Sequence, residues 1–172
     1  IMDEPYSGVR MKSGWSGTLS LPRVLSLDED SNLMIDVPQE VETLRYGELS
    51  LSECVIDSDK DLLVEGLFGN QLEIDLELSS EEAVSFGIKV CVSDEGTEET
   101  LIGYNYQASA LFLDTSNSGP EDTPKAIESA PLSLGLGEPI HLRVFIDRSV
   151  VEVFANKRQA IARRIYPAEA SS

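Results

Sequence analysis

The stretch Leu72-Glu-Ile-Asp-Leu-Glu-Leu78 decides the fold class of this chain, because its apolar and acidic residues alternate without a break. Successive side chains of a β-strand point to opposite faces of the sheet. The four apolar residues would therefore share one face, and Glu73, Asp75 and Glu77 the other. Two interpretations of the carboxylates follow: a glycosidase active site, or the water-facing side of an ordinary strand.

The same two-residue period recurs along the rest of the chain, between segments of turn composition. It is clear in Ile140–Asp147 and Val150–Ala155, and the second of these runs into Asn156-Lys157, a pair suited to a tight hairpin. Strands of about five to eight residues, with turn signals roughly every 8–12 residues, are typical of antiparallel sandwiches. We therefore predict an all-β fold, an antiparallel two-sheet β-sandwich of the jelly-roll or concanavalin-like type.

Helical periodicity is confined to the stretch from Val37 to Tyr46. Val37, Val41 and Leu44 have a spacing compatible with one helix face, and Pro38 suits a first helical turn. The pattern predicts one short helix or turn ahead of the sandwich.

The charge balance excludes two classes of partner. The chain of 172 residues has 31 acidic and 13 basic residues, a formal charge of −18. Such a field repels phosphate backbones and anionic lipid surfaces, so we expect neither nucleic acid nor a membrane as a partner. The sequence has no apolar run of about 20 residues, and the N-terminal Ile1-Met-Asp-Glu-Pro5 has none of the features of a signal peptide.

The residue types that hold metals and cofactors are scarce. His141 is the single histidine, and the two cysteines, Cys54 and Cys91, fit no metal-binding spacing. We therefore expect no metal and no cofactor. The cysteines either form one disulfide or remain as two buried free thiols.

The run Glu73-Ile-Asp-Leu-Glu77 resembles the Glu-x-Asp-x-Glu signature of the jelly-roll endo-glucanases of glycoside hydrolase family 16. That resemblance implies a nucleophile at Glu73, a group that tunes protonation at Asp75 and an acid/base at Glu77. Retaining chemistry needs carboxyl groups about 5–5.5 Å apart, so the side chains would have to lean together. Glucan clefts stack sugars on aromatic rings, and residues 72–78 contain none. The water-facing interpretation is therefore preferred.

Two other regions resemble glycoside hydrolase family 32, which comprises invertases, inulinases, levanases and related fructosyltransferases. Residues 13–23, SGWSGTLSLPR, are similar to the segment that closes the five-bladed propeller of that family. Residues 145–156, FIDRSVVEVFAN, resemble the end of its C-terminal β-sandwich. The resemblance covers about residues 10–167, and the Asp-Arg-Ser-x-x-Glu-x-Phe run is its most specific part.

The family 32 resemblance implies a domain organisation. Residues 1–23 would be the tail end of a missing N-terminal five-bladed β-propeller, with a detached propeller-closing strand, residues 24–47 a linker, and residues 48–172 the C-terminal β-sandwich. The catalytic groups of the family all precede the Gly-Trp-Ser-Gly segment, so no catalytic residue is assigned here. Glu53-Cys54 matches the Glu-Cys acid/base pair of the family in residue type, but it follows that segment and is not given the role.

The implied function is a non-catalytic C-terminal accessory domain of a β-fructofuranosidase-type glycoside hydrolase that acts on sucrose or fructans. The implied partner is the N-terminal catalytic propeller of the same protein, with Trp15, Leu19 and Arg23 as interface candidates. Contacts with the substrate cleft or within a homo-oligomer are further expectations. An extracellular or periplasmic location is favoured over a cytoplasmic one.

Two alternatives belong to other functional classes. A free-standing fructan-binding module would need aromatic platforms, and Tyr104 and Tyr106 share one strand face outside the expected core positions. Packing in a core or an interface is the competing interpretation of this pair. The other alternative is a purely structural module that forms homo-oligomers.

Overall fold

The structure is a computed structural model that describes residues 17–58 and 60–168. Within these residues, ten strands form three antiparallel sheets, and one short 3-10 helix lies between the second and third strands. The elements are β1 (Val24–Leu27), β2 (Leu33–Asp36), η1 (Gln39–Leu44), β3 (Gln71–Leu78), β4 (Ser85–Val90), β5 (Thr100–Asn105), β6 (Ala110–Asp114), β7 (Ile127–Pro131), β8 (Ile140–Asp147), β9 (Val150–Ala155) and β10 (Gln159–Arg164).

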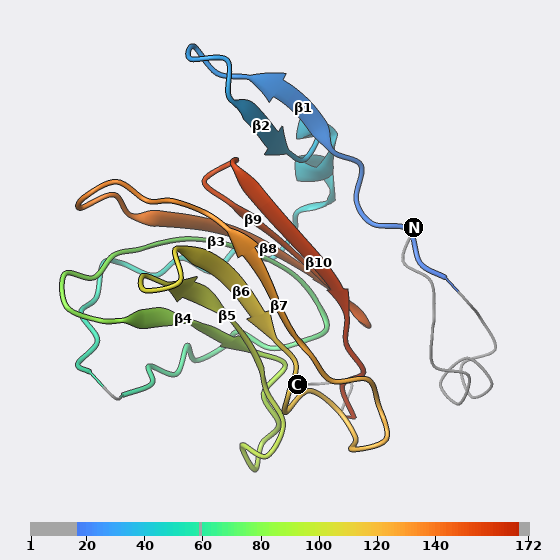
Figure 1. Ribbon diagram of the computed structural model, residues 1–172. Coiled ribbons are helices and arrows are strands. Elements are labelled where there is room, and N and C mark those ends of the chain that lie inside the picture. The colour runs from blue at the N-terminus through green and yellow to red at the C-terminus, as the bar shows by residue number, and fades with distance from the viewer. Residues whose placement is uncertain (1–16, 59, 169–172) are drawn as a thin grey trace.

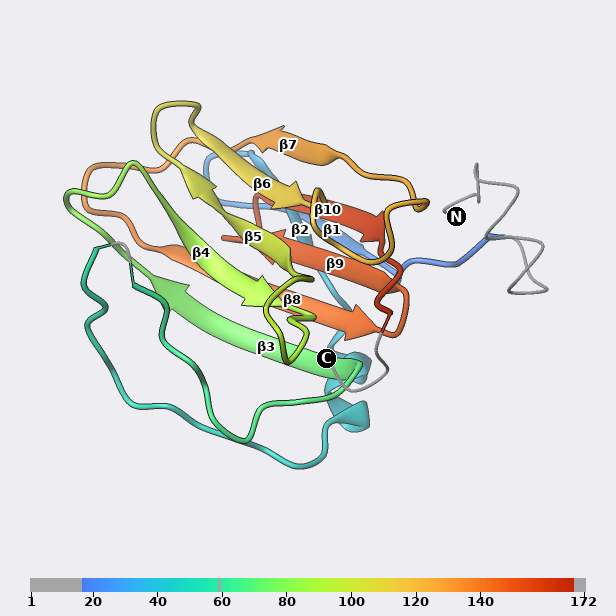
Figure 2. The same ribbon diagram turned by 90° about the horizontal axis from the view of Figure 1, so that it is seen from below.

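Two four-stranded sheets, in the orders β10-β9-β8-β3 and β4-β5-β6-β7, face each other across one core (Figures 1 and 2). Both sheets contribute fully buried apolar side chains to this core. The largest of them are Ile102, Tyr104, Leu111, Leu113, Ile140, Leu142, Val144, Val151 and Val153. The predicted all-β, two-sheet antiparallel sandwich is therefore confirmed.

The pairing of β3 with β8 shows why the acidic stretch forms a strand. The two strands are antiparallel over eight residue pairs, from Gln71 opposite Asp147 to Leu78 opposite Ile140. The apolar residues of β3 pack against the core, as the alternation predicts. The same period places Glu73, Asp75 and Glu77 on the opposite side of the sheet, which we call the outer face.

Strand β9 is buried on both of its sides. Val151, Val153 and Ala155 belong to the core, whereas Glu152 and Phe154 point to the outer face and are only 4% and 3% exposed. A sheet face that looked into solvent could not bury these two side chains. A third layer therefore covers this part of the outer face.

The third layer is formed by residues 17–23 and the β1–β2 hairpin, which lies on the far side of the β10-β9-β8-β3 sheet from the other sheet (Figure 1). The hairpin was not predicted, because residues 24–47 were expected to be a linker with one short helix. The helix is present as η1. At the hairpin turn, the Asp28 carboxylate accepts hydrogen bonds from the backbone N–H groups of Asp30 and Asn32, and Ser31 has a positive φ of 67°.

The structure also differs from the sequence prediction just before the sandwich. Residues 48–70 were assigned to the sandwich, yet the part of them that the structure describes contains no strand, and the first sandwich strand is β3. Several of their apolar side chains are exposed, including Val55 at 94% and Leu63 at 83%. Their apolar residues therefore do not add to the core.

The β9–β10 turn forms as the sequence indicates. Asn156 and Lys157 both have positive φ values, 49° and 53°. The Asn156 side chain accepts from the backbone N–H of His141 at 2.8 Å and donates to the carbonyl of Pro139 at 3.1 Å. These bonds join the turn to the start of β8.

The two cysteines are free: Cys91 is buried and Cys54 is exposed. The prediction of a disulfide is therefore wrong, and that of two buried thiols is right only for Cys91. Burial raises the pKa of the Cys91 thiol to about 11, so this thiol remains protonated at neutral pH.

Two facing glycines allow β4 and β5 to approach closely. Gly87 lies opposite Gly103, and a Cβ atom on Gly87 would stand 2.0 Å from the carbonyl oxygen of Ile102. We expect Gly87→Ala to lower the free energy of unfolding by about 1–3 kcal/mol, because the backbone of two paired strands must shift. Urea denaturation measures this loss.

Gly135→Ala is the matched control. Gly135 is exposed, and its nearest contact to an added Cβ, at 3.4 Å, is the flexible carboxylate of Glu138. A change within about 0.5 kcal/mol is expected there. Equal destabilisation by the two substitutions would contradict the proposed close approach.

Candidate functional site

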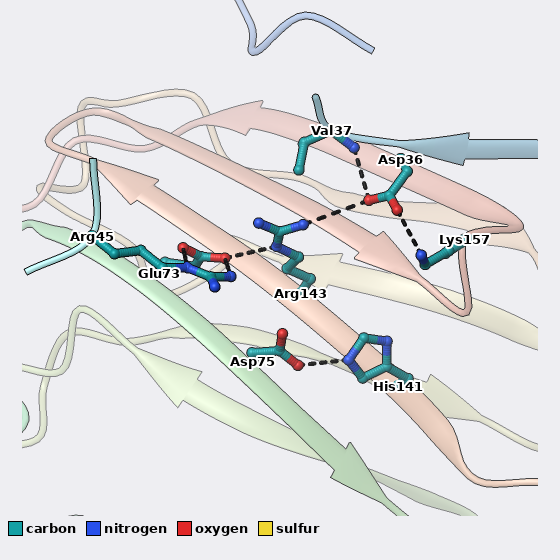
Figure 3. A network of polar contacts seen from close by, with 8 residues as sticks. All are labelled: Asp36, Val37, Arg45, Glu73, Asp75, His141, Arg143 and Lys157. Carbon is teal, nitrogen blue, oxygen red and sulfur yellow. Dashed lines mark hydrogen bonds and ion pairs between the residues drawn. The ribbon is translucent and has the colours of Figure 1, made fainter. Parts of the chain in front are cut away.

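The candidate site is the outer face of the β10-β9-β8-β3 sheet, where charged side chains of distant segments meet. Strand β3 supplies Glu73 and Asp75, and β8 supplies His141 and Arg143. The β1–β2 hairpin adds Asp36, the residue after η1 adds Arg45, and the β9–β10 turn adds Lys157 (Figure 3).

Glu73 lies between two arginines. Its Oε2 accepts from Nε of Arg45 at 2.7 Å, and its Oε1 accepts from Nη2 of Arg45 at 2.6 Å and from Nε of Arg143 at 2.7 Å. The Arg45 hydrogen bonds lower the pKa of Glu73; burial opposes the shift, and Arg143 adds to it. The carboxylate is therefore ionised, and both oxygens are occupied.

Arg143 extends the network across the sheet toward the hairpin. Its Nη1 lies 3.7 Å from Oδ1 of Asp36, and its guanidinium lies 5.1 Å from the ring centre of Phe145. Asp36 also pairs with Nζ of Lys157 at 2.9 Å and accepts from the backbone N–H of Val37 at 2.8 Å. Burial opposes ionisation of Asp36, but these hydrogen bonds outweigh it and lower its pKa. The network thus joins β2 to β8 and the β9–β10 turn.

Asp75 and His141 form a second pair beside the network. Oδ1 of Asp75 lies 2.6 Å from Nε2 of His141, and both side chains are partly exposed. Together with Arg45, Arg143 and neighbouring groups they line a hollow of about 250 Å³.

A buried carboxylate fastens residues 17–23 to the sheet. Oε1 of Glu152 accepts from the backbone N–H of Leu21 at 2.6 Å, and the guanidinium of Arg23 lies 5.8 Å from the ring centre of Phe154. Thr18 accepts from Nη2 of Arg164 at 3.1 Å. Burial raises the pKa of Glu152, although the Leu21 hydrogen bond and the charge of Arg23 act in the opposite direction.

This arrangement does not suit glycoside hydrolysis by the carboxylates of β3. A retaining enzyme needs a nucleophile and a nearby proton donor whose pKa is raised. Both oxygens of Glu73, the nucleophile in the family 16 resemblance, are occupied by hydrogen bonds from two arginines, and Asp75 is paired with His141. The carboxyl group with a raised pKa, Glu152, belongs to β9 and is covered by the third layer. The geometry favours a structural role for the β3 carboxylates.

The two tyrosines considered as a sugar platform lie largely inside the sandwich. Tyr104 is 1% exposed and donates to the carbonyl of Leu132 at 2.9 Å, so its expected place outside the core is wrong. Tyr106 is partly buried against the core and stacks edge-on with Tyr104, with ring centres 5.0 Å apart. Neither ring forms an open platform.

The three residues proposed for the propeller interface differ in what the structure shows of them. Trp15 lies outside the described residues. Leu19 is 75% exposed. Arg23 is exposed, with its guanidinium over Phe154.

Glu53 and Cys54, which were not given the acid/base role, lie in an exposed irregular segment. Among residues 17–58 and 60–168, no three His, Cys, Asp or Glu side chains are grouped so that they could hold a metal ion. In the same ranges, no helix has the length and apolar composition needed to cross a membrane.

Sequence reasoning missed Asp36, Arg45, Arg143 and Lys157 as members of this site. A charged residue on the polar side of a strand usually faces water, so nothing in the sequence around Arg143 indicated that it belongs to a site. Asp36 and Arg45 lie in the segment interpreted as a linker. The alternation of β8 could have placed Arg143 and His141 on the face of the acidic triplet, but only the pairing of β3 with β8 brings them together.

Comparison with known proteins identifies relatives over most of the chain. Residues 40–172 match the family model described as glycosyl hydrolases family 32 C terminal. A levanase of Bacillus subtilis is 32% identical over 169 residues, which is 92% of this chain and 24% of that protein. A sucrose-6-phosphate hydrolase of Staphylococcus xylosus is 32% identical over 149 residues, 86% of this chain and 29% of that protein. The extracellular exo-inulinase of Aspergillus awamori is 27% identical over 165 residues, 89% and 30% of the two chains.

Solved structures share the fold. The chain superimposes on fructan 1-exohydrolase IIa of Cichorium intybus with a TM-score of 0.80 and 20% identity, over 98% of this chain and 39% of that one. For the Aspergillus awamori exo-inulinase the TM-score is 0.67 with 22% identity, over 91% and 32%. The chain thus spans less than a third of the length of the curated relatives named above.

The network around Glu73 predicts a stability defect. In Glu73→Gln the two arginines lose their shared counter-ion, and Arg143 is mostly buried, with 11% of its side chain exposed. We expect the free energy of unfolding to fall by about 1–3 kcal/mol, measured by urea denaturation at neutral pH. Glu77→Gln, an exposed position on the same face, is the control and should change it by less than about 0.5 kcal/mol. Equal effects would argue against the network.

The lowered pKa of Glu73 also predicts how its contribution varies with pH. A carboxyl group with a depressed folded-state pKa stabilises the fold above its unfolded-state pKa, about 4.3 for Glu, and loses that contribution as the pH falls through the folded-state value. The difference in unfolding free energy between wild type and Glu73→Gln should therefore be full at pH 6 and shrink below about pH 4. Denaturation curves at a series of pH values measure it. A difference that stays constant down to pH 3 would show that ionisation of Glu73 contributes nothing.

Proposed function

Because the chain belongs to the C-terminal domain family of the family 32 glycosyl hydrolases, we propose that it is the non-catalytic accessory domain of a β-fructofuranosidase-type enzyme that acts on sucrose or fructans. The family match over residues 40–172 carries the proposal. Relatives named levanase, exo-inulinase and sucrose-6-phosphate hydrolase support the substrate class. The occupation of both Glu73 oxygens by arginines supports the absence of a catalytic role.

The partner in this proposal is the N-terminal catalytic part of the same protein. The chain spans 24–30% of the relatives named above, so most of such an enzyme lies in that part. In this proposal the chain passes from the catalytic part toward residues 17–23. The hydrogen bond between the backbone N–H of Leu21 and Glu152 holds this segment on the sheet. The accessory domain would then hold the end of the catalytic part in a fixed place.

The β1–β2 hairpin is the docking surface that we assign to this partner. Its apolar side chains point away from the sandwich: Leu25 is 62% exposed, Leu27 66% and Leu33 53%. Leu19, at 75%, adds to them. Groups of exposed large apolar side chains mark interaction surfaces in soluble proteins. This one is continuous in the chain with the covering segment 17–23.

An extracellular location is part of the proposal. It is supported by the exo-inulinase of Aspergillus awamori, which is described as extracellular, and by the acidic composition of this chain.

Binding to a separately produced catalytic part tests the docking surface. The N-terminal part of the Bacillus subtilis levanase, made without its own C-terminal domain, would be titrated with this chain. We expect binding and a rise in the melting temperature of the levanase part, because ligand binding to the folded state stabilises it. Isothermal calorimetry and thermal unfolding measure the two effects.

Substitutions on the hairpin locate the contact. Leu25→Lys combined with Leu33→Lys should weaken binding at least about tenfold, since interfaces depend on a few buried apolar anchors. Ile127→Lys is the control, because Ile127 is 62% exposed on β7 of the other sheet. If the hairpin variant binds as tightly as the wild type, the hairpin is not the docking surface.

A further inference from the structure

The hollow on the outer face is lined by equal numbers of acidic and basic side chains. Three acidic and three basic side chains line it: Asp36, Glu42, Asp75, Arg45, Arg143 and Lys157. His141 and Phe154 complete the lining. The lining residues come from the end of the hairpin, η1 and the residue after it, three sheet strands and the β9–β10 turn.

Only some of this hydrogen-bonding capacity is used inside the protein. One oxygen of Asp75 contacts Nε2 of His141, and the Asp75 side chain is 49% exposed. Lys157 has one carboxylate partner, Asp36, and is 57% exposed, so its ammonium group keeps donors for another molecule. The hollow therefore offers both acceptors and donors.

The charge arrangement selects the class of ligand. A phosphate or another anion would approach three carboxylates, and a metal cation would approach two guanidinium groups and an ammonium group. A neutral molecule with hydroxyl groups is repelled by neither set of charges. Its hydroxyls can donate a hydrogen bond to a carboxylate and accept one from a cationic group at the same time. Vicinal hydroxyls satisfy this pattern.

The size of the hollow limits the ligand further. At about 250 Å³ it is smaller than pockets for drug-sized molecules, which occupy about 300–1,000 Å³. It has room for one sugar ring rather than for a chain.

We propose that the hollow bounded by Asp75, His141 and Lys157 binds a single neutral sugar ring through its hydroxyl groups. This inference goes beyond the accessory role and does not depend on it, because every residue used belongs to this chain. Asp75 accepts from two neighbouring hydroxyls or from one hydroxyl and His141. Lys157 donates to a further hydroxyl.

The single histidine makes the site observable. His141 gives the only imidazole NMR signals of the chain. D-fructose and D-glucose would be titrated separately into the full chain at neutral pH, with inorganic phosphate and magnesium chloride as ionic probes. We expect a saturable shift of the His141 signals with at least one sugar, with a Kd in the millimolar range. The ionic probes should give no saturable shift.

Two variants with one control complete the test. Asp75→Asn and Lys157→Met should each weaken the affinity for the sugar about tenfold, the effect of losing one charge-assisted hydrogen bond. Glu77→Gln, on the same strand but outside the lining, should leave the affinity unchanged.

Three results would overturn the inference. One is the absence of a saturable shift with either sugar up to about 100 mM, the concentration at which even very weak binding would be detected. Another is a stronger response to phosphate or magnesium, which would make the hollow an ion site. The third is an affinity that both variants leave unchanged.

Discussion

The contact on which the arrangement of the outer face depends is the pairing of Glu73 with Arg45 and Arg143 at 2.6–2.7 Å. Arg45 directly follows η1, Glu73 belongs to β3 and Arg143 to β8, so one carboxylate joins the end of η1 to two strands of the sheet. Arg143 continues the connection to Asp36 at the end of β2. A carboxylate held by charge-assisted bonds from two directions is fixed in geometry as well as in charge. The hairpin and η1 are thereby tied to the sandwich at both of their C-terminal ends.

This constraint separates the two sides of the β10-β9-β8-β3 sheet. The inner side is a dry core that the alternating strands fill, and the outer side is partly covered and partly open. Where residues 17–23 cover it, Glu152 and Phe154 are buried; where the covering ends, charged side chains surround the hollow. An accessory domain built in this way presents an apolar hairpin to a partner and keeps a polar hollow beside it. The two proposals therefore concern neighbouring but different surfaces.

Much of the fold could be predicted from the sequence, because the period of two in β3 and β8 matches the burial that the structure shows. The β9–β10 turn could also be predicted from local sequence, because asparagine tolerates the positive φ that Asn156 adopts. The hairpin could not be predicted from the sequence. Residues Val24 to Leu27 are all exposed, so buried and exposed positions do not alternate along this strand. The charged site was hidden for a different reason. Its ion pairs join residues 28–121 positions apart, and only the folded chain brings them together.

The most direct test of the central claim, that the carboxylates of β3 are structural, is a turnover assay of the purified chain alone. The substrates would be sucrose, inulin, levan and a mixed-linkage β-glucan, with Glu73→Gln assayed in parallel. The account predicts no release of sugar from any of the four by either protein, because both oxygens of Glu73 are held by two arginines and cannot attack a sugar. Hydrolysis of the β-glucan that is lost in Glu73→Gln would contradict it and would make residues 73–77 an active site.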